Sequence, residues 1–307
     1  MISPLRQRGV ICYTNPMSAY DYIAAIYNPN STNDAKLRAT KFKDAAKKRG
    51  VTVHLHPTDH RGHARTYGYD FTLKHKRPLL ISVSGDGGYN ELVDGVMAAK
   101  RASKSRRPVV AVIGAGNAND HKRTTRGDTP LIKLIDKEPK TLDLLRMQSK
   151  GVDRYAHSYI GLGITPEVGM ELNRHTLSPG RELFIAWQAF WKFRPFTIKR
   201  SGKKEKFSSI IFANINGMAK VIRLNESTGV RDGKFDLIAF PYKGKLHLAF
   251  ELFRSALFGN SDAPEYSRYT FRTTHELAVQ LDGEIETVPA NTEVKITSEK
   301  EAIESLY

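Results

Sequence analysis

The chain has 307 residues, of which 40% are hydrophobic and 26% are charged. This composition is typical of one large or two ordinary folded domains, and it excludes an intrinsically disordered chain. The 48 lysines and arginines outnumber the 32 acidic residues, giving a net charge of +16. Such a charge favours an anionic partner (nucleotide, acidic lipid or nucleic acid), with a solvated basic surface as the alternative.

The single cysteine, Cys12, excludes an intramolecular disulfide and a cysteine-rich zinc site, and it is compatible with a reducing compartment. No apolar run reaches the roughly 18 residues expected of a membrane span. Residues 1–20 lack the apolar core of a signal peptide, and we expect them to form an N-terminal extension. The sequence therefore predicts a cytoplasmic protein, with peripheral membrane contact left open.

Strands and helices alternate over residues 21–138. Three of the predicted strands end in small or polar loops, at Asn28, Gly85 and Gly114. The alternation indicates βαβ units and a parallel sheet, in which ligands bind at the carboxyl ends of the strands, so these loops should share one site. The expected strands are 23–27, 51–55, 79–84 and 108–113, and the expected helices are 35–49, 63–74 and 90–100.

Short β-type runs dominate residues 139–294. Turn signals such as Asp232-Gly233 and Asp282-Gly283 separate them, which predicts a mainly antiparallel β domain. Residues 295–307 are expected to pack back on the N-terminal domain. The expected strands are 156–162, 207–214, 235–241, 270–274, 277–281 and 293–296, and the expected helices are 181–193 and 246–258.

A glycine-rich turn separates the apolar strand 79–84 from the helix pattern that follows it. Gly85, Gly87 and Gly88 would let a phosphate approach backbone N–H groups at a helix N-terminus. Asp86 lies in the middle of this turn, where an acid suggests a metal ion or a reacting hydroxyl beside the phosphate. The alternative is an ordinary turn aspartate.

Four motifs together carry a family resemblance. The chain resembles the diacylglycerol kinase catalytic-domain family of lipid kinases, which includes diacylglycerol, sphingosine and ceramide kinases, over roughly residues 23–296. The resemblance implies an α/β nucleotide-binding domain (21–138) and a β-rich substrate domain (139–294), with ATP and lipid meeting between them. The motifs are Asn28-Pro29-x-Ser31, Ser84-Gly85-Asp86-Gly87-Gly88-x-Asn90-Glu91, Gly116-Asn117-Ala118-Asn119-Asp120 and Leu281-Asp282-Gly283-Glu284.

The resemblance also implies a role for each motif residue, with ATP and Mg²⁺ as cofactors. Asp282 would be the general base, with Glu284 beside it and Asp86 as a third catalytic residue. A placed carboxylate suits phosphoryl transfer to an alcohol, because it accepts the hydroxyl proton; a plain hairpin turn is the alternative at Asp282-Gly283. The implied nucleotide-binding residues are Asn28, Ser31, Gly85, Gly87, Gly88, Asn90, Glu91, Gly116, Asn117, Asn119 and Asp120.

Asp232 matches a family position linked to a structural Mg²⁺. Position 229, where a second acid would help, is glycine, so a plain turn is the alternative at Asp232. The aromatic segment 183–194 fits a membrane-interface helix, packing against the β domain, or the lining of a lipid pocket.

Two loops depart from the family pattern. In the usual Gly-Gly-Asp-Gly-Thr, Ser84 replaces the first glycine and Gly88 the threonine. In the usual Pro-x-Gly-Thr-x-Asn-Asp, Gly114 replaces the proline and Asn117 the threonine. Two hydroxyl contacts to phosphate are therefore missing, for which backbone N–H groups and the Asn117 amide can substitute.

The leading interpretation is an ATP-dependent lipid kinase that phosphorylates a hydroxyl of a diacylglycerol-like or sphingoid lipid at a membrane surface. One alternative is an NAD kinase-type phosphotransferase, which shares the glycine–aspartate–glycine turn, although Asp282-Gly283-Glu284 favours the lipid branch. Another is a non-catalytic basic protein that binds membrane or nucleic acid. The leading interpretation expects no nucleic acid, and the sequence leaves a homodimer open.

Overall fold

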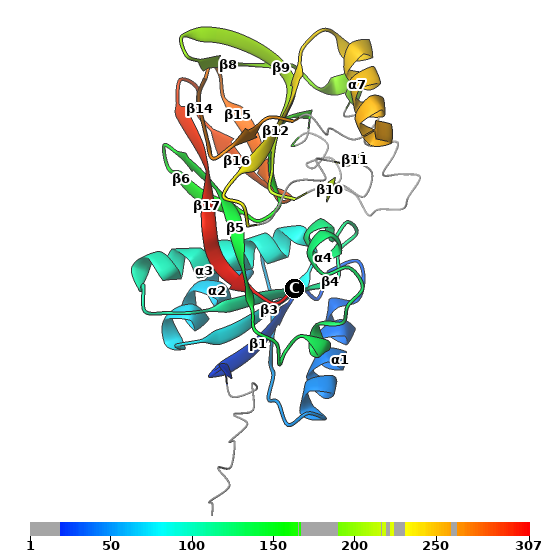
Figure 1. The fold of residues 1–307 in the computed structure, drawn as a ribbon, viewed down its shortest axis with the longest axis vertical. Coiled ribbons are helices and arrows are strands. Elements are labelled where there is room, and N and C mark those ends of the chain that lie inside the picture. Colours follow the sequence, from blue (N-terminus) through cyan, green and yellow to red (C-terminus); the bar gives the residue numbers. More distant parts are fainter. Residues whose placement is uncertain are drawn as a thin grey trace, which may run out of the picture.

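The fold consists of two halves stacked along the long axis of the molecule (Figure 1). The computed structural model describes residues 19–164, 166, 190–215, 217–218, 222–223, 231–258 and 263–307. The lower half in Figure 1 is an α/β layer structure, and the upper half is rich in antiparallel strands. The predicted fold class is therefore confirmed.

The lower half is built on a parallel sheet whose strands lie in the order β4–β3–β1–β2. Helices cover both faces of this sheet (Figure 1). Its elements are β1 (Tyr22–Tyr27), α1 (Ala35–Lys47), β2 (His54–Pro57), α2 (His63–Lys74), β3 (Pro78–Ser84), α3 (Asp86–Ala102), β4 (Val109–Gly114), α4 (Asp120–Thr125) and the 3₁₀ helix η2 (Leu131–Lys133).

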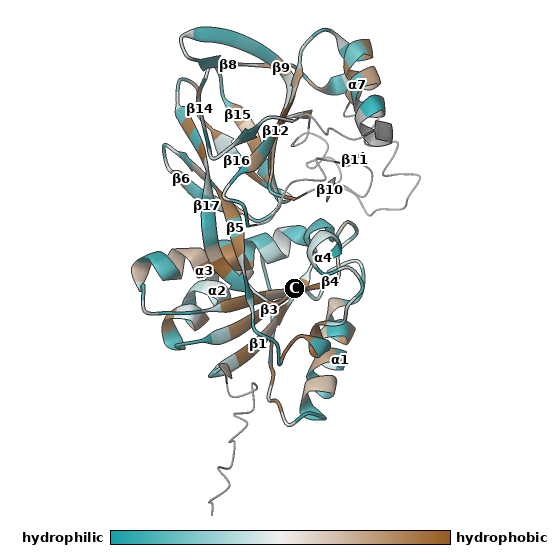
Figure 2. Ribbon diagram, viewed as in Figure 1, coloured by the Kyte–Doolittle hydropathy of each residue, from teal (hydrophilic) through white to brown (hydrophobic). Residues whose placement is uncertain are grey.

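Alternation along each buried strand sends neighbouring side chains to opposite faces of the sheet. Ile81 in β3 packs in the cluster that contains Phe42 of α1. Its neighbour Leu80 packs in the cluster that contains Leu92 and Val96 of α3. Apolar residues are concentrated on the sheet between the helices (Figure 2), so each helix is held by its apolar face.

The upper half is mainly antiparallel, and the described residues of its core form two clusters of aliphatic and aromatic side chains, one of which contains Leu248 of helix α7. Its elements are β5 (Lys140–Ser149), β6 (Val152–Ala156), β7 (Tyr159–Gly163), β8 (Phe196–Arg200), β9 (Lys203–Ala213), β10 (Gly217–Met218), β11 (Ile222–Arg223), β12 (Phe235–Pro241), α7 (Lys245–Phe258), β13 (Glu265–Tyr266), β14 (Arg268–Thr273), β15 (Leu277–Leu281), β16 (Glu284–Val288) and β17 (Glu293–Ser305).

The C-terminal strand β17 connects the two halves. Its first part pairs with β14 and β5, and its last residues pair with β4, where Glu304 lies opposite Val109 in a parallel ladder. The register with β5 shifts between Glu299 and Ile303. In the described residues, β17 therefore links the antiparallel strands of the upper half and the parallel strands of the lower half into one hydrogen-bonded sheet.

Several predicted elements differ from the structure. The run 156–162 is not one strand, because the chain leaves the ladder at His157 and Ser158 between β6 and β7. Helix α3 begins at Asp86, four residues before its predicted start, so the glycine turn forms its first helical turn. The predicted helix 181–193 lies mostly outside the described residues. Among the described residues, no helix combines the length and hydropathy needed to span a bilayer.

Candidate active site

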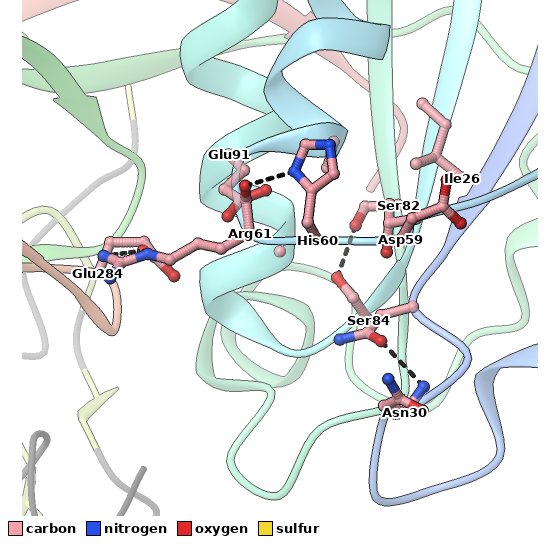
Figure 3. Close-up of a pocket in the computed structure, with 13 residues that line it drawn as sticks. Ile26, Asn30, Asp59, His60, Arg61, Ser82, Ser84, Glu91 and Glu284 are labelled. Carbon is pink, nitrogen blue, oxygen red and sulfur yellow. Dashed lines mark hydrogen bonds and ion pairs between the residues drawn. The ribbon is translucent and has the colours of Figure 1, made fainter. Parts of the chain in front are cut away.

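A cavity of about 280 Å³ opens where the parallel strand order reverses, at the carboxyl ends of β1 and β3 (Figure 3). Such reversals are the usual ligand sites of open α/β sheets. Most of its lining comes from the lower half, but Glu284 comes from the upper half. The lining residues are Ile26, Asn28, Asn30, Thr58, Asp59, His60, Arg61, Ala64, Ser82, Ser84, Gly88, Glu91 and Glu284.

Oxygen atoms dominate the chemistry of this pocket. The Ser82 and Ser84 hydroxyls bond each other at 2.7 Å (Figure 3), and Glu91 Oε1 accepts from the Gly62 N–H at 2.7 Å. Carboxylates would repel a polyphosphate unless a cation lay between them. Hydroxyl and carboxylate oxygens are suitable ligands for Mg²⁺, so the donor set fits a metal-complexed nucleotide.

The two departures from the family pattern in the first loop are coupled in space. A Cβ atom at Gly88 would lie 2.5 Å from Ser84 Oγ and 2.8 Å from Ser84 Cβ. Both distances are too short for any side chain, so Ser84 occupies the space that a residue larger than glycine at position 88 would need. Serine at position 84 therefore requires glycine at position 88. Ser84 lines the pocket, where the family pattern would have a threonine at position 88.

The two glycine-containing loops touch each other. A Cβ at Gly116 would lie 2.5 Å from the Cα of Gly85, so this contact requires glycine. Asp86 then accepts hydrogen bonds from the backbone N–H groups of Asp120 (3.1 Å) and His121 (3.2 Å), at the start of α4. The first loop is thus fastened to the second through Asp86.

Asp282 lies in the turn between β15 and β16, fully buried between the halves. Asp282 and Gly283 both have positive φ, at 48° and 97°, as the two central residues of a tight hairpin turn require. The Asp282 carboxylate accepts from the backbone N–H groups of His157 (2.6 Å), Ser158 (3.1 Å) and Tyr159 (2.8 Å). The break between β6 and β7 supplies these donors.

Asn90 joins the glycine-loop motif to the Asp282 motif. In the amide orientation that satisfies both of its ends, the Asn90 Nδ2 donates to Asp282 Oδ2 (3.3 Å) and to the Tyr155 carbonyl (2.8 Å). A Cβ at Gly87 would lie 3.2 Å from Glu284 Oε1, so the hairpin rests against the glycine loop. Motifs about 190 residues apart in the sequence therefore meet at the junction of the halves.

Burial sets the protonation of this junction. It raises the pKa of Asp282 to about 7, although the backbone hydrogen bonds oppose the shift. Burial, followed by the negative charge of Asp120, raises the pKa of Asp86 to about 6. His157 Nε2 lies 3.3 Å from the Asp86 carbonyl and 3.4 Å from Asp282 Oδ2, but burial lowers its pKa to about 3, so it is neutral there.

Arg61 crosses from the lower half to the upper half at the mouth of the pocket (Figure 3). Its Nε donates to Glu284 Oε2 at 2.7 Å. The two halves are therefore also joined by an ion pair that contacts the pocket directly.

The structure brings many predicted site residues together and leaves others apart. Four of them line the pocket: Asn28, Gly88, Glu91 and Glu284. Four others lie where the glycine loop contacts the second loop and the Asp282 hairpin: Asp86, Asn90, Asp120 and Asp282. Ser31 is not among the lining residues. Asn117 and Asn119 line a different cavity on the opposite face of the sheet.

Asp232 is exposed, and its carboxylate accepts from the Lys234 N–H at 2.9 Å in a local turn. Burial raises the pKa of the nearby Asp143, and the negative charge of Asp232 adds to this shift, whereas hydrogen bonds from the Gly233 and Glu301 N–H groups to the Asp143 carboxylate oppose it. Position 229 lies outside the described residues. In the described part of the chain, no three His, Cys, Asp or Glu side chains are grouped to hold a metal.

Sequence reasoning missed several residues of the site. The N–H donors of His157, Ser158 and Tyr159 act through the backbone, so no side-chain motif marks them. Arg61 follows β2 in a loop without a recognisable pattern. The one available signal was position: the loop after β2 leaves the sheet at the same edge as Asn28 and Gly85.

Comparison with known proteins bears on the family. Residues 22–147 match the family model for the diacylglycerol kinase catalytic domain. Diacylglycerol kinases of Staphylococcus carnosus (30% identical over 118 residues) and Staphylococcus epidermidis (32% over 114 residues) align with 36% of this chain. The match spans only about a third of those curated relatives, 35% and 34% of their lengths.

The fold is shared over a much longer stretch. The crystal structure of a diacylglycerol kinase from Bacillus anthracis superposes with a TM-score of 0.68 and 18% identity, covering 94% of this chain and 97% of that one. The resemblance to the diacylglycerol kinase catalytic-domain family is therefore confirmed, with the catalytic-domain match located at residues 22–147.

Proposed function

We propose that this protein is an ATP-dependent lipid kinase that transfers the γ-phosphoryl group to a hydroxyl of a diacylglycerol-like or sphingoid lipid. The single observation that carries the proposal is the contact of Asp282 and Glu284 with the glycine loop at the edge of the pocket. The catalytic-domain match and the curated diacylglycerol kinases support a lipid kinase. We also propose residues 21–138 as the nucleotide-binding domain and 139–294 as the substrate domain.

In this proposal, the pocket at the ends of β1 and β3 holds part of the nucleotide, with Asn28, Ser84 and Gly88 beside it. When bound, Mg²⁺ would supply positive charge to the phosphates, and the Glu91 and Glu284 carboxylates, which line the pocket, would help to hold it. The pocket volume of about 280 Å³ is small for a whole nucleotide, so the remainder would extend into the junction between the halves.

The chemical step requires a proton acceptor. As the lipid oxygen bonds to the γ-phosphorus and the bond to the β–γ bridging oxygen breaks, the hydroxyl proton passes to a carboxylate and ADP leaves. Asp282 is our proposed base, because burial gives its carboxylate a pKa of about 7, close to the working pH of the cytoplasm. Its oxygens already accept several N–H groups, so the substrate hydroxyl must displace the Asn90 amide to reach it.

Asp86 is the second candidate for the base. Asp86 is partly exposed where the two halves meet, whereas Asp282 is fully buried. Its pKa of about 6 also leaves it ionised at neutral pH. The variants Asp282→Asn and Asp86→Asn distinguish the two candidates, because only the variant of the general base loses the group that accepts the hydroxyl proton.

A lipid kinase must reach its substrate at a membrane, and we propose that the upper half makes this contact. Leu246 (82% exposed), Phe250 (61%) and Trp191 (48%) are large apolar side chains open to solvent. Lys245 stacks over the Trp191 ring with its Nζ 5.7 Å from the ring centre and also donates to the Trp191 carbonyl, so the three lie in one region. An apolar patch flanked by a lysine suits the interfacial layer of a bilayer.

The test is incubation of the protein with γ-labelled ATP and Mg²⁺, with diacylglycerol, sphingosine, NAD or buffer alone as acceptor. We expect label in a lipid. Label in NAD and not in lipid would establish the alternative phosphotransferase. No transfer to any acceptor, with steeply salt-dependent binding to polyanions, would support a non-catalytic basic protein.

A further inference from the structure

A second cavity, with a volume of about 780 Å³, lies on the other face of the parallel sheet. Phe42, Leu131 and Ile113 in its wall belong to the core cluster on the α1 side of the sheet. The candidate nucleotide pocket is on the α2 and α3 side, since Ile26 and Ala64 in its wall belong to the opposite cluster. We call this second cavity the α1 groove; it lies between α1, α4 and residues 128–132.

Cations surround the α1 groove. Five line it: Arg38, Lys41, Lys122, Arg123 and Arg126. Arg123 is paired with Asp120 (2.6 Å), and Lys122 lies 3.4 Å from the fully exposed Asp128. In the described part of the chain, no carboxylate pairs with Arg38, Lys41 or Arg126. The groove therefore has an uncompensated positive charge.

Arg126 is the clearest case of a groove cation that has no carboxylate partner within the described structure. Its Nη2 donates to the Val112 carbonyl at 2.6 Å, which fixes the guanidinium against the end of β4. Its Nε is buried and has no hydrogen-bond partner within the described structure. Burial also lowers the pKa of Arg126. A half-buried guanidinium without a carboxylate partner carries a desolvation cost, which a bound anion would offset.

Helix α1 contributes two further positive charges to the α1 groove, those of Arg38 and Lys41. Arg38 is oriented by its Nε, which donates to the Asn33 carbonyl at 2.8 Å. The Lys41 side chain makes no hydrogen bond or ion pair with any residue that the structure describes. Both residues are exposed, so an anion can reach them without rearranging the core. Arginine and lysine together are suited to a phosphate group.

The inner wall of the groove is apolar. Phe42, Ala45 and Ile132 line it together with the cations. A bare inorganic anion would leave this wall in contact with water, whereas a phosphate ester would place its organic part there. The groove thus combines a cationic edge with an apolar wall.

We propose that the α1 groove is a second ligand site, separate from the nucleotide pocket, and that it binds a phosphate ester. The phosphate would lie among Arg38, Lys41 and Arg126, and the organic part against Phe42. The ester can be a soluble metabolite or the headgroup of a phospholipid, since both present the same phosphate chemistry. The inference does not depend on the proposed kinase activity.

The test compares two double variants of α1. Arg38→Ala/Lys41→Ala removes two charges from the groove, and Lys36→Ala/Lys43→Ala removes two exposed charges on the same helix that do not line it. Binding of glycerol 3-phosphate is measured by calorimetry, and binding to vesicles of phosphatidylglycerol or phosphatidylcholine by co-sedimentation. An ATP analogue is titrated in parallel, and circular dichroism checks that each variant is folded.

We expect the groove variant to lose at least about tenfold in affinity for the phosphate ester, and the matched variant less than about twofold. Loss with glycerol 3-phosphate identifies a soluble ligand, and loss confined to phosphatidylglycerol vesicles identifies a lipid headgroup. Equal losses in both variants would reduce the effect to general surface charge and overturn the proposal. Equal weakening of the ATP analogue would also overturn it, because the groove would then belong to the nucleotide site, as would failure of the wild-type protein to bind any phosphate ester.

Discussion

Arg61 and Glu284 form an ion pair between the two halves of the molecule at the mouth of the candidate nucleotide pocket. Arg61 Nε donates to Glu284 Oε2 at 2.7 Å, and the Arg61 side chain is 67% exposed. Such an exposed ion pair contributes only about 0–1 kcal/mol to stability. We therefore expect the pair to matter for the pocket that it lines more than for the stability of the fold.

Replacing Arg61 should therefore affect nucleotide use more than folding. Arg61→Ala removes a cation from the pocket mouth, and we expect the KM for ATP to rise about tenfold, as for loss of one charge-assisted hydrogen bond. Arg49→Ala is the matched control, since Arg49 forms a similar exposed pair with Asp136 at 3.0 Å away from the pocket. Equal KM values for the two variants would count against a nucleotide role for Arg61.

Ser84 and Gly88 should behave as a coupled pair. Gly88→Thr alone places a Cβ 2.5 Å from Ser84 Oγ and should cost about 1–3 kcal/mol in unfolding free energy. The double variant Ser84→Gly/Gly88→Thr restores the family pattern and removes the clash. Urea denaturation of both single variants and the double variant should give a favourable coupling energy of about 1–3 kcal/mol. Additive effects would show that the two positions are independent.

The packing of α2 against α3 depends on Gly95. A Cβ there would lie 2.0 Å from the Arg65 carbonyl oxygen, which belongs to the backbone of α2 and cannot rotate away. We expect Gly95→Ala to lower the free energy of unfolding by about 3 kcal/mol, near the upper end for overpacked sites. Lys74→Ala, at an exposed position of α2, should change it by less than about 0.5 kcal/mol. Thermal or urea unfolding measures both, and equal values would contradict this account.

The proposed membrane contact predicts a specific loss of vesicle binding. Leu246→Asp or Phe250→Asp should each weaken binding to lipid vesicles about tenfold, since burying such a side chain contributes about 1.5–3 kcal/mol. Leu37→Asp is the control, because Leu37 is also exposed (47%) but lies on α1 in the other half. If Leu37→Asp were as damaging as the α7 variants, the patch would have no special role.

Activity should rise with pH through about 7, because Asp282 must be ionised to accept a proton and burial raises its pKa to about that value. Stability should follow the opposite trend. A carboxyl that binds its proton more tightly in the folded chain stabilises the folded chain below pH 4, and this contribution is lost as pH rises through about 7.

Asn90→Asp adds a negative charge beside Asp282 and should move the midpoint of the pH dependence of activity to higher pH. A midpoint that does not move would argue against Asp282 as the titrating base.

The sequence predicted well those elements whose pattern is local. Helix α2 and strands β12 and β15 have the predicted bounds, because periodicity and turn residues mark both ends of each. The strand at 156–162 was wrong, because the chain there leaves the ladder to present N–H groups to Asp282, a residue more than 120 positions away. A tertiary demand of this kind has no signature in the local pattern.

The site was foreseeable only where side chains carry the chemistry. Asn28, Gly88, Glu91 and Glu284 could be named from motifs, and they line one pocket. The contact between Ser84 and Gly88 needed coordinates, because each residue alone is unremarkable in sequence. The α1 groove also escaped prediction, since its cations come from α1, α4 and the residue after α4, which meet only in the folded chain.

The most direct test of the central claim is the rate of label transfer from γ-labelled ATP to lipid by the wild-type protein, Asp282→Asn and Asp86→Asn. We predict transfer to a lipid by the wild type and a loss of about 10²–10⁴-fold in Asp282→Asn, as expected when a general base is removed. Near-ultraviolet circular dichroism must show that the variant is folded, since Asp282 also accepts three backbone N–H groups. Wild-type rates in folded Asp282→Asn, with loss in Asp86→Asn, would assign the base to Asp86, and absence of lipid labelling by the wild type would contradict the proposed function itself.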